Sequence, residues 1–199
     1  MRGERALAFM LAALLSGAAS GVRAQPAGEQ PSPGLWAGKV FRWSYNPRNA
    51  PAWLGNEASR QWMVEASRQW EACGLKVEYQ GETDRVPGTM DGANVVGWRP
   101  DLPRQVRGIT QGRAGRGRLL ERDIAFSPDR LEFERFPVLL RKVIVHEFGH
   151  AIGLTHSAGC NDVMTLAADC ARAHPDTLPL TPTPHDLARC RALYDGAAR

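Results

Sequence analysis

One segment constrains the fold more than any other part of the chain: residues 146–156 read HEFGHAIGLTH. Residues four apart lie on one face of a helix, so His146 and His150 can bind the same ion. Glycine tolerates the positive φ of a sharp turn, so Gly153 can end the helix and bring His156 back to that ion. Three histidines with a fourth position left for water are typical of a catalytic zinc site. The segment therefore predicts a helix, a turn and a metal centre.

The residue between the two helical histidines adds chemistry to the predicted site. Glu147 follows His146 in the pattern His-Glu-x-x-His, where the glutamate serves as a general base beside zinc. The alternative is that the three histidines are core residues and bind no metal. A protein that only binds zinc does not need this carboxylate, so Glu147 favours a hydrolytic enzyme over an exported zinc-binding module without peptidase activity.

The remaining elements follow from hydrophobic periodicity and from helix end signals. We expect strands at 40–45, 75–79, 93–98, 108–111 and 122–126. We expect one helix from its cap Asn56 to Cys73, and a second from Val138 to Gly153, with Pro137 at its first position. A capping box at 183–186 predicts a last helix that ends near Tyr194. This order predicts an α/β (α+β) domain with a mixed sheet.

The N-terminal region has the composition of an export signal. Arg2 and Arg5 precede the apolar run Ala6–Leu15, and small residues lead to a cleavage site after Ala24. We therefore expect a signal peptide at 1–24, a flexible leader at 25–37 and one catalytic domain at 38–199. The apolar run is shorter than the roughly 20 residues that span a bilayer, so we expect no membrane anchor. The mature protein is expected to be secreted, into the periplasm or the medium.

Charge argues against a nucleic-acid partner. The formal net charge is only +4, which gives little support to binding of a polyanion. Arginines are frequent between 104 and 122. This stretch is either a surface that attracts acidic substrates or a hydrated glycine-rich loop. We expect no nucleic acid as a partner.

The cysteines fit an oxidising compartment. The chain has four, an even number, and none lies in a CxxC pair that would suggest a zinc site. Cys160 and Cys170 are close in sequence, so we predict that they pair and that Cys73 pairs with Cys190. The two other connectivities stay open at this point.

The segment HEFGHAIGLTH, with Ser157 after the third histidine and Met164 beyond it, resembles the zinc signature of the metzincin metallopeptidases, in their matrixin branch. The resemblance implies a twisted, mostly parallel five-stranded sheet with two long helices. It also implies a small C-terminal subdomain that carries the last helix and the Met-turn, where Met164 supports the zinc from below without binding it. The positions of Cys73 and Cys190 resemble those of a bridge in the astacin branch.

The same resemblance implies a function. It predicts a secreted zinc metalloendopeptidase with one catalytic Zn²⁺ bound by the three histidines and with Glu147 as general base. A protein or peptide substrate would lie in an active-site cleft, antiparallel to an edge strand, for which residues 107–111 are the best candidate. We expect the protein to be a monomer.

The chain also departs from animal matrixins. No cysteine precedes Cys73, so their cysteine-based latency device is not expected. Only His174 and His185 remain outside the motif, so a second, structural zinc is not expected. Thr165 follows Met164 where those enzymes usually have tyrosine, which changes the neighbouring specificity pocket. The sequence makes no prediction about calcium.

Overall fold

The computed structural model describes residues 34–158, 161–165 and 179–195. These residues form a five-stranded sheet in the order β2-β1-β3-β5-β4. Its strands are β1 (Val40–Asn46), β2 (Lys76–Glu82), β3 (Val95–Trp98), β4 (Gly108–Gly115) and β5 (Arg118–Phe126). Strands β2, β1, β3 and β5 run parallel to one another, and β4 pairs antiparallel with β5 at the edge. The predicted mixed sheet of five strands is confirmed, and β4, one of its two edge strands, contains most of the predicted edge residues 107–111.

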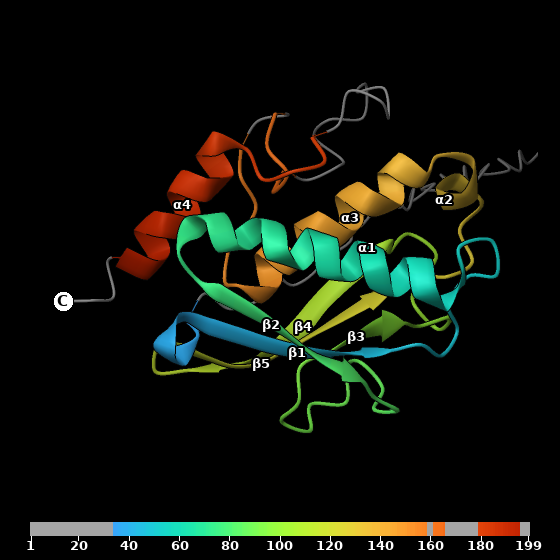
Figure 1. Cartoon of the computed structure of the whole chain (residues 1–199), viewed down its shortest axis with the longest axis horizontal. Helices are drawn as coiled ribbons and strands as arrows, with labels where there is room; N and C mark the ends of the chain where they lie inside the picture. The colour runs from blue at the N-terminus through green and yellow to red at the C-terminus, as the bar shows by residue number, and fades with distance from the viewer. Residues whose placement is uncertain (1–33, 159–160, 166–178, 196–199) are drawn as a thin grey trace, which may run out of the picture.

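Two long helices lie on the same side of this sheet (Figure 1). They are α1 (Gly55–Gln69), which continues into the short 3-10 turn η2 (Trp70–Cys73), and α3 (Pro137–Ala151). The remaining elements are the 3-10 turn η1 (Ala37–Lys39), the short helix α2 (Leu131–Arg135) and the last helix α4 (Pro184–Asp195). No described helix has the length and apolar character needed to cross a membrane.

The core between the sheet and the helices is rich in aromatic side chains. Phe148 on α3 lies edge-on against Trp43 of β1, with the ring centroids 5.1 Å apart. Trp70, fully buried at the end of α1, donates from its indole Nε1 to the backbone oxygen of Val145 at 3.0 Å. These contacts fix α3 against both the sheet and α1, and α3 is the helix that carries the histidine motif.

The described elements differ from the expected ones in three places. Asn56 does not cap α1, because the helix begins at Gly55 and Leu54 occupies the cap position without a side-chain hydrogen bond. The backbone oxygen of Pro51 instead accepts from the N–H groups of Leu54 and Gly55. The hydrated-loop interpretation of the arginine-rich stretch is wrong, because the strands expected at 108–111 and 122–126 are longer and form the β4–β5 hairpin there. Helix α2 was not expected from the sequence.

The leader predicted at 25–37 is also too long at its end. Leu35 accepts from the N–H of Leu119 and donates to the backbone oxygen of Gly117, so it pairs with the β4–β5 hairpin. Trp36 donates from Nε1 to the oxygen of Ala151 at 2.9 Å. Residues 34–37 therefore belong to the folded domain, because two large apolar side chains bury area there despite the Pro/Gly-rich composition. The predicted signal peptide and residues 25–33 lie outside the described residues.

One predicted disulfide is present. It joins Cys73 at the end of η2 to Cys190 in α4, at a sequence separation of 117 residues. Cys160 and Cys170 lie outside the described residues, as does His174. The observed bridge attaches the small C-terminal subdomain, which contains α4 and the Met-turn, to the first helix.

Candidate metal centre

The three histidines of the motif converge in space. The ring nitrogens that His146, His150 and His156 offer all lie within 4.8 Å of one another. The Nε2 atoms of His150 and His156 are 3.1 Å apart. Two nitrogens bound at about 2.0–2.1 Å to one tetrahedral zinc are separated by about 3.3 Å, so this spacing fits ligands that share an ion.

Backbone carbonyls set the orientation of two of these rings. The Nδ1 atom of His146 lies 2.7 Å from the oxygen of Val163, and the Nδ1 atom of His150 lies 2.7 Å from the oxygen of Leu154. A carbonyl oxygen only accepts, so each Nδ1 carries the proton and donates it. Each Nε2 then presents a lone pair toward the centre of the cluster, which is the tautomer a metal requires.

Electrostatics favour the same protonation state. Burial lowers the pKa of His146 to about 4, and the hydrogen bond to Val163 opposes only part of that shift. Burial and then the charge of the neighbouring His146 lower the pKa of His150 to about 3. Both rings are neutral at pH 7 and can donate a lone pair to zinc. The donor set therefore fits a zinc ion.

The turn that returns His156 to the cluster depends on a glycine and an arginine. Gly153 has φ of 104°, and a Cβ there would meet the backbone oxygen of Gly34 at 2.4 Å, so no other residue fits. Arg189 of α4 donates from Nη2 to the carbonyl oxygens of Thr155 at 2.9 Å and His156 at 3.2 Å. The turn at Gly153 was expected from the sequence, whereas the role of Arg189 was not.

Met164 lies directly beneath the histidine helix and is fully buried. A Cβ at Gly149 would meet its sulfur at 2.2 Å, so Gly149 allows the methionine to approach α3 between the two helical histidines. The N–H of Ser157 donates to the oxygen of Met164 at 3.0 Å, which closes the turn. Met164 contacts the helix that carries the ligands.

The buried carboxylate of Asp186 fixes the Met-turn from the other side. It accepts from the backbone N–H groups of Val163, at 2.9 Å, and Thr183, at 3.0 Å. The Thr183 hydroxyl in turn accepts from the N–H of Asp186 at 3.1 Å, which confirms the capping box at the start of α4. The same carboxylate thus caps a helix and holds the residue whose carbonyl orients His146.

Glu147 is buried, with 6% of its surface exposed, and points toward strand β4. Its Oε2 atom accepts a hydrogen bond from the hydroxyl of Thr110 at 2.7 Å. Burial raises the pKa of Glu147 to about 7, and the bond from Thr110 opposes part of this rise. Sequence reasoning missed Thr110, because nothing in the local pattern of β4 marks a residue that meets another element 37 positions away.

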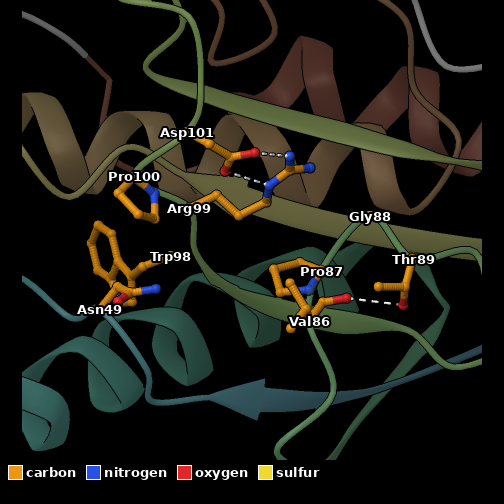
Figure 2. A pocket seen from close by; sticks show the side chains of 9 residues that line it. All are labelled: Asn49, Val86, Pro87, Gly88, Thr89, Trp98, Arg99, Pro100 and Asp101. Carbon is orange, nitrogen blue, oxygen red and sulfur yellow. Dashed lines mark hydrogen bonds and ion pairs between the residues drawn. The ribbon is translucent and has the colours of Figure 1, made fainter.

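A hollow of about 280 Å³ lies beyond the carboxyl ends of β1 and β3 (Figure 2). Several of its polar groups have partners within the fold. Arg99 pairs with Asp101, and the hydroxyl of Thr89 donates to the oxygen of Val86. None of the lining residues belongs to the histidine cluster, and the hollow presents no set of convergent reactive groups.

Two solved structures resemble the fold at low identity. The GM1-bound form of the ECX AB5 holotoxin matches with a TM-score of 0.49 and 14% identity, over 78% of this chain and 80% of that chain. Archaemetzincin from Methanopyrus kandleri matches with a TM-score of 0.49 and 17% identity, over 79% and 97% respectively. These similarities assign no activity or substrate to this chain. No curated protein matches it significantly.

The sequence profile of the matrixin peptidases matches residues 44–195. This match contains the three clustered histidines, Glu147 and Met164, together with α1, α3 and α4. It covers well over half of the chain, and the chain therefore belongs to the matrixin family of zinc metallopeptidases.

Proposed function

We propose that this protein is an exported zinc metalloendopeptidase that cleaves peptide bonds with Glu147 as its general base. The observation that carries the proposal is the geometry of the centre: the ring nitrogens of three histidines converge on one point, and the buried carboxylate of Glu147 lies beside the first of them. Membership of the matrixin family supports the same activity.

His146, His150 and His156 would hold one zinc ion. When bound, zinc supplies Lewis acidity, which polarises a carbonyl group and lowers the pKa of water at the open fourth position. Burial keeps the rings of His146 and His150 neutral, and the carbonyls of Val163 and Leu154 orient these two rings. A second zinc is not part of the proposal, since His185 is hydrogen-bonded to Asp162 at the start of α4.

Glu147 performs the proton transfers. In its ionised form the carboxylate takes a proton from the attacking water and then gives it to the leaving nitrogen of the cleaved bond. A pKa raised toward neutrality suits both steps, because a group that titrates near the working pH is able to accept and to return a proton. Burial around the carboxylate also keeps bulk water from competing for it.

Strand β4 supplies the place for an extended peptide. It pairs with β5 on one side, and within the described residues no strand covers its other side. Gln111, Gly112 and Arg113 are exposed along it. A peptide that adds to this edge by backbone hydrogen bonds would lie beside α3 and its histidines. The substrate class is therefore an extended protein or peptide segment.

The proposed location is outside the cytoplasm. The signal-like composition of residues 1–24 supports export. The disulfide between Cys73 and Cys190 supports it as well, because such bridges persist in oxidising compartments.

The experiment that tests the function compares the purified mature chain with its Glu147→Gln variant on a diverse peptide library, with and without a chelator. We expect cleavage that the chelator abolishes, and a loss of about 10²–10⁴-fold in kcat/KM for the variant. Elemental analysis should find close to one zinc in both proteins. Glu134→Gln, an exposed site on α2, serves as the matched control and should cleave like the wild type. A wild-type chain that binds zinc but cleaves no peptide would contradict the proposal and favour a zinc-binding module.

A further inference from the structure

Thr110 and Glu147 meet across two separate elements of the fold. The hydroxyl of Thr110, on edge strand β4, lies 2.7 Å from Oε2 of Glu147 and 3.0 Å from its backbone oxygen. Both residues are buried, with 3% of the surface of Thr110 exposed. The contact is therefore shielded from water, which strengthens a hydrogen bond to a carboxylate.

The contact engages only one of the two carboxylate oxygens. A hydroxyl has one proton to donate, and an ionised carboxylate only accepts, so the shorter contact, with Oε2, takes the proton. Within the described part of the chain, the side-chain hydrogen bond of Glu147 engages Oε2 and not Oε1. One oxygen is thus fixed and the other is left for the water or the substrate.

Gly108, two residues before Thr110, lies against the side chain of Glu147. A Cβ at Gly108 would lie 3.0 Å from Cγ of Glu147 and 2.8 Å from Cγ1 of Val143. Residues two apart on a strand face the same side, so Gly108 and Thr110 both face α3. The glycine lets the strand approach the stem of the carboxylate, and the threonine holds its end.

We propose that Thr110 is a positioning residue for Glu147: its hydroxyl fixes the carboxylate in the orientation needed for proton transfer. This inference rests on the proposed peptidase function. Strand β4, on which the peptide substrate is proposed to lie, then also positions the general base. Substrate and base are set by one strand, so their relative placement does not depend on a flexible glutamate side chain.

The first experiment compares Thr110→Val, which keeps the shape and removes the hydroxyl, with Thr110→Ser, which keeps the hydroxyl. We expect Thr110→Val to lower kcat about 10–100-fold, a range typical of a misplaced catalytic group, with little change in KM. Thr110→Ser should recover most of the loss. Thr89→Val, which removes a hydroxyl remote from the site, is the matched control and should behave like the wild type.

A second experiment tests the contact without activity. The melting temperatures of Thr110→Val, Glu147→Ala and the double variant are compared in the presence of a chelator. We expect the shift caused by Thr110→Val to become smaller once Glu147 is removed, because the two groups share one interaction.

The outcomes separate the two proposals. A wild-type chain without peptidase activity overturns the proposed function and the positioning role with it. An active wild type with an equally active Thr110→Val variant overturns the positioning role alone. If the melting-temperature shifts of Thr110→Val and Glu147→Ala simply add in the double variant, the two groups do not interact and the contact is overturned. If Thr110→Ser lowers kcat as much as Thr110→Val, the packing of the side chain and not its hydroxyl supports catalysis, which also overturns the positioning role.

Discussion

His146 and His150 lie on a helix packed against the sheet, whereas His156 lies in a segment that α4 holds by its backbone. On the first side the contacts are apolar and extensive, and they include Phe148 against Trp43. On the second side the described contacts include directed polar bonds to the backbone, as with Arg189 on the carbonyl oxygens of Thr155 and His156. The disulfide between Cys73 and Cys190 attaches that side to the first helix.

The two kinds of contact should have different effects when they are removed. Apolar packing spreads over many residues, so a loss on the sheet side destabilises the whole domain. Directed hydrogen bonds and the Cys73–Cys190 bridge act at particular atoms, so a loss on the α4 side can release one ligand while the sheet stays folded. Variants of the C-terminal subdomain should therefore weaken zinc binding by the folded protein, whereas variants of the core should lower stability and leave that zinc affinity unchanged.

The largest expected effect comes from removing the bridge. The variant Cys73→Ala with Cys190→Ala should lose about 4–5 kcal/mol of unfolding free energy, the chain-entropy value for a loop of about a hundred residues. Guanidinium denaturation measures the loss. The folded variant should also bind zinc more weakly, because α4 carries both Arg189 and Asp186.

The matched control for the bridge is Met63→Ala on α1, a fully buried core site. This substitution leaves a cavity and should lower the free energy of unfolding by about 2–5 kcal/mol, while the zinc affinity of the folded protein stays unchanged. Equal loss of zinc affinity in both variants would remove the distinction between the two sides.

A smaller effect is expected from Arg189→Met, which keeps the apolar stem and removes the donor to the His156 segment. Zinc affinity should fall about 10–100-fold, the range for partners that orient a metal ligand, while the melting temperature of the zinc-free protein changes little. Competition with a chromogenic chelator measures the affinity. Arg191→Met on the same helix, which gives up an exposed bond to the oxygen of Ala72, should retain wild-type affinity. If both variants bind zinc like the wild type, α4 does not hold the third ligand.

The smallest effect concerns Lys142, a buried lysine on α3 one turn before His146, with 7% of its surface exposed. Burial lowers the pKa of its ammonium group, and the carboxylate of Asp186 opposes this only in part. The unfolded chain therefore holds more protons than the folded one between the lowered value and the ordinary 10.5, and wild-type stability rises with pH across that window.

Lys142→Met should accordingly stabilise the zinc-free protein at pH 7, by about 1 kcal/mol, because a buried charge is replaced by an apolar side chain of similar length. The gain should shrink as the pH approaches 10. Urea denaturation at several pH values measures the gain in unfolding free energy and its decrease toward pH 10. A stability difference that is the same at pH 7 and pH 10 would mean that the ammonium group is not disfavoured by burial.

Much of the metal centre was predictable because its determinants are local. The spacing of His146 and His150, the positive φ at Gly153 and the capping box at 183–186 each follow from a few consecutive residues. The order of strands and helices predicted a mixed sheet for the same reason, since periodicity is a property of short windows. The pairing of Cys73 with Cys190 was predicted by sequence proximity of the other two cysteines, and two further connectivities had stayed open.

The tertiary structure alone decided which distant residues support the reactive groups. Thr110 reaches Glu147 because β4 pairs antiparallel with β5, in a register that places Thr110 opposite Ile124. Arg189 reaches the His156 segment because the bridge at Cys190 fixes α4 beside the end of the first helix. Leu35 and Trp36 join the domain because the hairpin and the end of α3 offer them backbone partners. Such contacts depend on strand register and packing, which arise from the whole chain folding together, and no short window of sequence encodes them.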